Sequence, residues 1–147
     1  SMSYVARHTS TRALQKGDVV QADGMEPQLA GAQQPIMQVT AAKSNDQVLG
    51  VVVGRTDMTM VEPGTEDAKP GPHYGPTGGA ALPGDYLVVM VQGMAQVRVD
   101  PASNTRSGDR IGLSADGMAE PVDMSAFGMV LEQADEDGLA WVLIGFD

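Results

Sequence analysis

The sequence predicts an all-β fold, arranged as a pseudo-duplicated small barrel or sandwich with one long loop rich in proline and glycine. Three observations support this. Stretches with apolar residues at helical spacing are almost absent, whereas short β-branched runs bounded by Gly, Asp, Asn and Pro recur along the chain. The chain of 147 residues contains 18 glycines and 9 prolines. It is nevertheless 42% hydrophobic, too apolar for a disordered chain, and that combination is typical of many short strands.

The length corresponds to about one domain, and we expect residues 3–147 to form it. Ser1-Met2 is typical of a scar left by tag removal and is left out of the fold prediction. The predicted strands are, in order, Asp18–Gln21, Ile36–Thr40, Val48–Arg55, Met58–Val61, Tyr86–Gln92, Met94–Asp100, Arg110–Leu113, Ala119–Val122, Gly128–Gln133 and Leu139–Phe146.

Turn residues between these runs predict hairpins. Asp23-Gly24, Asp116-Gly117 and Asp137-Gly138 each pair a residue that tolerates positive φ with one that has no Cβ. The acidic run around the last pair lacks the ligand spacing of a calcium loop. We therefore interpret it as a solvated hairpin tip.

An internal repeat indicates the duplication. Residues Lys16–Pro27 match Ser107–Pro121, since both contain Gly-Asp, a short strand, Ala-Asp-Gly-Met and Glu-Pro. The Gly-Asp pairs are Gly17-Asp18 and Gly108-Asp109, and a third, Gly84-Asp85, precedes the strand at Tyr86. Glycine supplies the turn conformation and aspartate accepts backbone N–H groups at the strand entry. The alternative is that such dipeptides are simply common in turn-rich β proteins.

The segment Pro63–Gly84 breaks the strand pattern because prolines and glycines crowd it, and we expect a loop there rather than a strand. It contains His73-Tyr74, the only histidine–aromatic pair of the chain, which makes it the expected contact loop. Two other interpretations stay open. The segment is a surface loop without a role, or it becomes ordered only against a neighbouring subunit.

Composition excludes several classes of function. With Cys 0, disulfides and cysteine-based catalysis or metal sites are impossible. Nineteen acids against nine bases give a net charge of −10, which disfavours nucleic acid and anionic membranes as partners. With His 2, a site of three histidines is impossible. We expect no cofactor, no metal and a soluble protein.

Catalytic motifs give no support for an enzyme. His8 and His73 are the only histidines, and no serine lies in a Gly-x-Ser-x-Gly elbow. No phosphate loop follows Gly78-Gly79. The 10 methionines are expected mainly to fill an aromatic-poor core, the alternative being an adaptable contact surface between chains. Trp141 is expected to be the largest core side chain.

The order of elements resembles the C-terminal β-domains of phage tail-fibre and neck-appendage proteins, including self-cleaving intramolecular chaperones. The segments that carry this resemblance are Leu14–Val20, Val48–Gly54, Gln92–Val99, Ser107–Ile111 and Phe127–Glu132.

The resemblance implies a homotrimeric β-structure that caps or assembles a fibre or decorates a particle, on a virion or extracellular particle surface. We therefore predict a non-enzymatic assembly module that forms a homo-oligomer, with a trimer favoured. Two alternatives are an autoproteolytic chaperone domain, although cleavage residues do not map onto the chain, and a carbohydrate-binding module that uses His73 and Tyr74. The expected partners are further copies of the chain and a glycan or protein surface.

Overall fold

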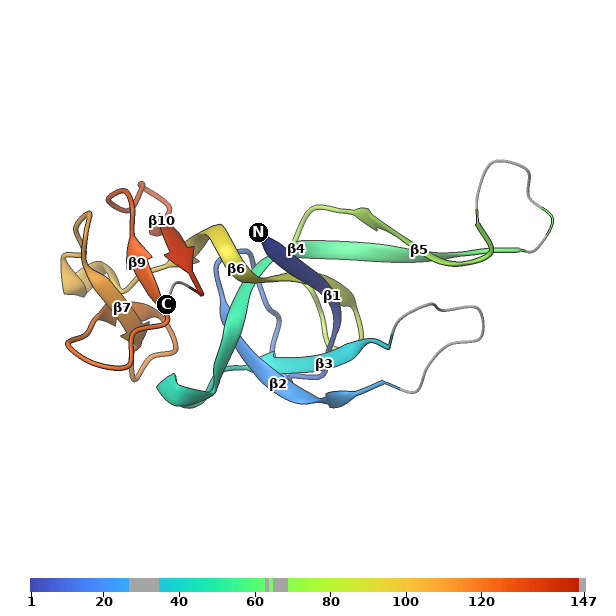
Figure 1. The fold of residues 1–147 in the computed structure, drawn as a ribbon, viewed down its shortest axis with the longest axis horizontal. Coiled ribbons are helices and arrows are strands. Elements are labelled where there is room, and N and C mark those ends of the chain that lie inside the picture. Colours follow the sequence, from blue (N-terminus) through green and yellow to red (C-terminus); the bar gives the residue numbers. More distant parts are fainter. Residues whose placement is uncertain (27–34, 63, 65–68, 146–147) are drawn as a thin grey trace.

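The computed structural model describes residues 1–26, 35–62, 64 and 69–145 (Figure 1). Ten strands form one continuous sheet, so the all-β prediction is confirmed. Their bounds are β1 Met2–His8, β2 Val19–Met25, β3 Met37–Ala41, β4 Val48–Val61, β5 Gly71–Pro76, β6 Tyr86–Arg98, β7 Arg110–Leu113, β8 Ala119–Pro121, β9 Gly128–Val130 and β10 Leu139–Ile144. Two short 3-10 helices, Asn45–Gln47 and Pro101–Ser103, precede β4 and follow β6.

The N-terminal part of the sheet closes on itself. Strands pair in the order β4-β2-β3-β1-β6, and β6 then pairs with β4, which completes a small barrel. The β1–β3 pair is parallel and the others are antiparallel. We call this the first ring. Its interior is filled by buried side chains: Ala6, Leu14, Val20, Val39, Val52, Ala81, Leu87 and Val89.

A second ring is built on the C-terminal half of β6. Here the order is β6-β10-β9-β7-β8, with antiparallel pairs throughout. A parallel bridge between Val99 and Ala119 links β8 back to the end of β6. Strand β6 is therefore the last strand of the first ring and the first strand of the second, and Figure 1 shows the two rings on either side of it.

The two rings share one topology. In each, the first strand pairs in parallel with the third, and all other pairs are antiparallel. Individual backbone hydrogen bonds are also equivalent. Thr9 donates its N–H to the carbonyl of Val39 at 2.9 Å, and Asp100 donates to Ala119 at 2.8 Å. The duplication predicted from the repeat is therefore a duplication of whole barrels.

Two glycines occupy equivalent crowded positions in the rings. A Cβ on Gly50 of β4 would collide with the carbonyl oxygen of Met90. A Cβ on Gly128 of β9 would lie 2.6 Å from Cγ1 of Val142 and 3.1 Å from the oxygen of Leu143. In both rings the strand lies so close to its neighbour that only glycine fits.

Several predicted strands prove to be longer than expected. Predicted strands Val48–Arg55 and Met58–Val61 are one strand, β4. The predicted strands on either side of Gly93 are likewise one strand, β6, because Gly93 adopts a φ of +135° inside it without ending the ladder. The continuity of β6 allows it to serve both rings.

Strand β1 was not predicted. Its inward positions are Ala6 and His8, one small and one polar, so no apolar run marks it in the sequence.

The segment predicted as a loop contains a strand. Gly71–Pro76 forms β5, which pairs with the distal half of β4 and with no other strand of the described chain. An edge strand tolerates Pro72 and Pro76 because one side of its backbone needs no ladder partner. Residues 63 and 65–68 of that segment, and Phe146 of the last predicted strand, lie outside the described residues.

The turn predicted at Asp23-Gly24 is not a hairpin turn. Both residues lie within β2, where the register with β3 shifts between Ala22 and Met25. Gly24 has a φ of +110°, a conformation that glycine adopts readily, so it permits the irregular pairing within β2.

Candidate functional site

The three Gly-Asp pairs fold into the same turn. Gly17, Gly84 and Gly108 have φ of +94°, +94° and +90°. In each turn the Oδ2 atom of the following aspartate accepts the backbone N–H of the residue three positions earlier, at 2.8 Å. These aspartates are engaged with the backbone, so their role in this structure is to fix strand entries.

Asp18 also joins the two rings. Its Oδ1 lies 3.5 Å from Nε of Arg98 on β6, and its Oδ2 lies 3.6 Å from Nη1 of Arg12. Arg98 in addition donates to the carbonyl of Lys16 at 3.3 Å. These contacts hold the Gly17-Asp18 turn against β6, the strand that belongs to both rings.

The predicted contact pair, His73 and Tyr74, lies on β5. Neighbouring residues of a strand point to opposite faces, so the two side chains do not form one surface. Nε2 of His73 lies 2.6 Å from the carbonyl oxygen of Lys69. The Tyr74 ring packs edge-on against Tyr86, with 5.6 Å between centroids. The structure thus places His73 toward solvent and Tyr74 against the first ring.

His8 is fully buried, which the sequence did not indicate. Its Nδ1 accepts the N–H of Ser10 at 2.9 Å, and its Nε2 lies 2.7 Å from the carbonyl oxygen of Arg12. This pattern requires the proton on Nε2, because Nδ1 faces a donor and Nε2 an acceptor. Burial lowers the pKa of His8, which favours the neutral ring. His8 therefore holds the loop that follows β1.

Trp141 is not a core residue. Its side chain is 44% exposed, because the inward positions of β10 are Ala140, Val142 and Ile144. Strict alternation along this strand places Trp141 and Leu143 outside the second ring. The alternation is present in the sequence and places Trp141 outside. The expectation of a core position rested on the size of the side chain alone.

Methionine is also absent from the fully buried core of the described chain. Met25, Met60, Met94 and Met124 are instead exposed. The prediction that methionines mainly fill the core was wrong. The core consists of valine, alanine, leucine and isoleucine, whose smaller side chains fit inside narrow rings.

Outward apolar side chains of β6, β10 and β9, and of the residue that follows β9, lie next to one another on the second ring, with Gln96 of β6 beside Trp141. Met94 is paired with Leu143, and Leu143 with Met129. In the next row, Leu131 donates its N–H to the carbonyl of Trp141 at 2.8 Å. Met94, Trp141 and Leu131 are 61%, 44% and 38% exposed. We call these five residues the apolar face.

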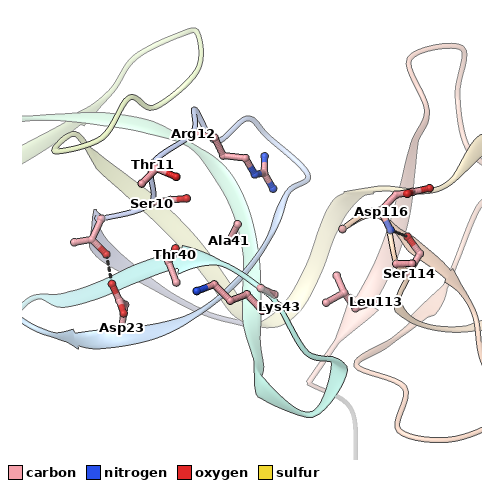
Figure 2. A pocket seen from close by; sticks show the side chains of 14 residues that line it. Ser10, Thr11, Arg12, Asp23, Thr40, Ala41, Lys43, Leu113, Ser114 and Asp116 are labelled. Carbon is pink, nitrogen blue, oxygen red and sulfur yellow. Dashed lines mark hydrogen bonds between the residues drawn. The ribbon is translucent and has the colours of Figure 1, made fainter.

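A cleft separates the two rings on another part of the molecule, with a volume of about 680 Å³ (Figure 2). One wall comes from the loop after β1 and from the end of β3 with the residues that follow it. The other wall comes from the β7–β8 turn, which contains the predicted Asp116-Gly117 pair. The lining is mostly polar: Thr9, Ser10, Thr11, Arg12, Asp23, Thr40, Ala41, Ala42, Lys43, Leu113, Ser114, Ala115, Asp116 and Gly117.

Comparison with known proteins finds likeness in structure alone. No family model matches the chain, and no curated protein matches it in sequence. Among solved structures, the head fiber gp8.5 N base of bacteriophage phi29 aligns over 98% of this chain and 93% of its own, at 18% identity and a TM-score of 0.49.

The bacteriophage phi29 gene product 12 C-terminal fragment aligns over 98% and 99% of the two chains, at 17% identity and a TM-score of 0.44. Both are phage proteins, the class that the sequence resemblance indicates. Within the described residues, no helix is long and apolar enough to cross a membrane.

Proposed function

We propose that this chain is a non-enzymatic structural module of a phage-like fibre, appendage or decorated particle, and that it assembles with further copies of itself through the apolar face. The observation that carries the proposal is this cluster of outward Met, Leu and Trp side chains on β6, β10 and β9 and directly after β9. The phage assignment comes from the order of sequence elements, which resembles phage β-domains.

The chemistry of the apolar face suits association between copies. Contiguous apolar patches of this kind are uncommon on monomers, and aromatic and methionine side chains are enriched in interface cores. The five side chains carry no charge, although the chain as a whole has a net charge of −10. Contact there buries apolar area without bringing carboxylates of two copies together.

The state of the two histidines supports a non-enzymatic role. His8 is buried with both ring nitrogens engaged, and Nε2 of His73 contacts a backbone carbonyl. A general base needs a nitrogen within reach of a substrate proton. His8 offers none, because both of its ring nitrogens are engaged with the backbone.

Sedimentation velocity at micromolar concentration tests the proposal. We expect the wild type to sediment as an oligomer, the trimer being the state that the resemblance implies, and Met94→Lys to sediment as a monomer. Met124→Lys is the matched control, because Met124 is 78% exposed and lies outside the apolar face. Circular dichroism establishes that each variant is folded. A monomeric wild type, or a Met94→Lys variant as oligomeric as wild type, would overturn the proposal.

A further inference from the structure

The cleft between the rings holds two cationic side chains on a strongly acidic protein. The chain has 9 Lys and Arg against 19 Asp and Glu, yet Arg12 and Lys43 both line the first-ring wall of this one cleft. Figure 2 shows both side chains on that wall, opposite Ser114 and Asp116. With Asp23 and Asp116 in the same lining the formal charge of the cleft is zero, so an anion is repelled less there than by a chain of net charge −10 as a whole.

Both cations keep hydrogen-bonding capacity for a ligand. Lys43 donates its backbone N–H to Gln21 at 2.9 Å, while its ammonium has no partner among the described residues. The side-chain contacts of Arg12 within the described chain involve Nη1: 3.6 Å to Asp18 and 3.4 Å to the carbonyl of Ala13. A guanidinium has five N–H donors, so Nε and Nη2 are available, and Asp18 orients the group.

Two acids also line the cleft and balance its two cations in formal charge. Asp23 accepts the hydroxyl hydrogen of Thr9 at 2.5 Å, which engages its Oδ2. Figure 2 shows the Asp116 side chain on the opposite wall, directed away from Arg12. Neither acid forms an ion pair with Lys43 within the described residues. The carboxylates instead add acceptors at the edges of the cleft.

Hydroxyl groups make up much of the remaining lining, from Thr9, Ser10, Thr11, Thr40 and Ser114. Hydroxyls both donate and accept, and they match the hydroxyls of a polyol. A volume of about 680 Å³ lies within the usual range for small-molecule sites, about 300–1,000 Å³. No lining residue is aromatic, so binding there would depend on hydrogen bonds and charge and would lack ring stacking.

We infer that the cleft binds a small hydroxylated oxyanion, a carboxylate or phosphate carried on a sugar-like polyol. Arg12 and Lys43 take the oxyanion, and the Ser and Thr hydroxyls take the hydroxyl groups. This site is distinct from the predicted contact pair His73-Tyr74, which lies on the β4–β5 hairpin. It is also independent of self-association, since none of its residues belongs to the apolar face.

Chemical-shift perturbation of the isotope-labelled full chain tests the inference, with glucuronate, glucose 6-phosphate, glucose and inorganic phosphate as probes. We expect saturable shifts at lining residues with the two acidic sugars, and affinity at least about tenfold weaker for glucose, because charge-assisted hydrogen bonds are lost. Inorganic phosphate should perturb the Arg12 and Lys43 wall alone. The two acidic sugars tell whether a carboxylate or a phosphate is preferred.

Two variants test whether the cleft is the site that binds the acidic sugars. Lys43→Gln should weaken glucuronate and glucose 6-phosphate binding about tenfold. Lys16→Gln is the matched control, since it removes the same charge from an exposed position outside the lining and should leave affinity unchanged. The inference is overturned if no acidic probe perturbs the lining residues, if glucose binds as well as glucuronate, or if the two variants behave alike.

Discussion

Asp18 and Asp109, which lie 91 positions apart in the numbering, make the same hydrogen bond in the two rings: each Oδ2 accepts a backbone N–H three residues earlier at 2.8 Å. The glycine before each aspartate donates its N–H to the facing strand, to Val52 at 2.9 Å and to Val130 at 2.8 Å. A turn with this geometry sets where β2 and β7 begin. The repeated sequence therefore specifies a repeated register.

Replacement of these aspartates should cost stability unequally. We expect Asp109→Ala to lower the free energy of unfolding by about 1–2 kcal/mol through loss of the charge-assisted bond. Asp18→Ala should cost more, because it also removes the contacts to Arg12 and Arg98. Urea denaturation measures both. Equal losses in the two variants would show that the contacts between Asp18 and the arginines contribute nothing.

Gly50→Ala should be among the most destabilising small substitutions in the first ring. Its Cβ would collide with the Met90 carbonyl, and strand separation to relieve the overlap should cost about 1–3 kcal/mol or more. Gly54→Ala, on the same strand with nothing within 4 Å of its Cβ, is the control and should be neutral or slightly stabilising. Thermal unfolding distinguishes them, and similar midpoints for both variants would contradict the close approach of β4 to β6.

His8 should make stability depend on pH. Burial lowers its pKa, an effect opposed by the Arg12 carbonyl and by Asp85 and reinforced by the Arg12 charge. The folded state therefore prefers the neutral ring. Its contribution is fully present above the ordinary value of 6.5 and is lost as pH falls from there through the folded pKa.

Urea denaturation should thus show that the free energy of unfolding falls between pH 7 and pH 5. In the His73→Gln variant, NMR titration of the His8 ring should give a lower pKa in the folded protein than in the same protein unfolded in urea. The His73→Gln variant leaves His8 as the only histidine, so the ring signal is assigned without ambiguity. A free energy of unfolding that stays constant between pH 7 and pH 5 would mean that the folded protein accepts the protonated His8 ring without loss of stability.

The sequence indicated the architecture well where apolar alternation and turn residues agree. The Gly-Asp repeat pointed to a duplicated β unit because the same turn is required twice. Strand β1 was not predicted because its inward residues, Ala6 and His8, are small and polar and do not form an apolar alternation. The cleft could not be predicted, because Arg12, Lys43 and Ser114 meet only when one ring packs beside the other.

Tyr74 and Tyr86 provide a matched test of what a hydrogen-bond partner contributes to a tyrosine hydroxyl group. The Tyr74 hydroxyl is buried without a hydrogen-bond partner in the described chain, whereas the Tyr86 hydroxyl accepts a bond from Nη1 of Arg7 at 3.2 Å. We expect Tyr74→Phe to raise the free energy of unfolding by about 1 kcal/mol, since an unsatisfied polar group is removed. Tyr86→Phe should lower it by about 1 kcal/mol, since a satisfied one is lost.

The same burial predicts a pH signature for Tyr74. Desolvation, with a smaller contribution from Tyr86, raises the pKa of the Tyr74 phenol above its ordinary value of 10.0. The neutral phenol is favoured in the folded state, so its contribution is present below pH 10 and is lost as pH rises through the folded pKa. Tyr74→Phe should abolish this alkaline loss in urea denaturation. If Tyr74→Phe instead lowers stability at neutral pH, the hydroxyl has a hydrogen-bond partner and its desolvation is compensated.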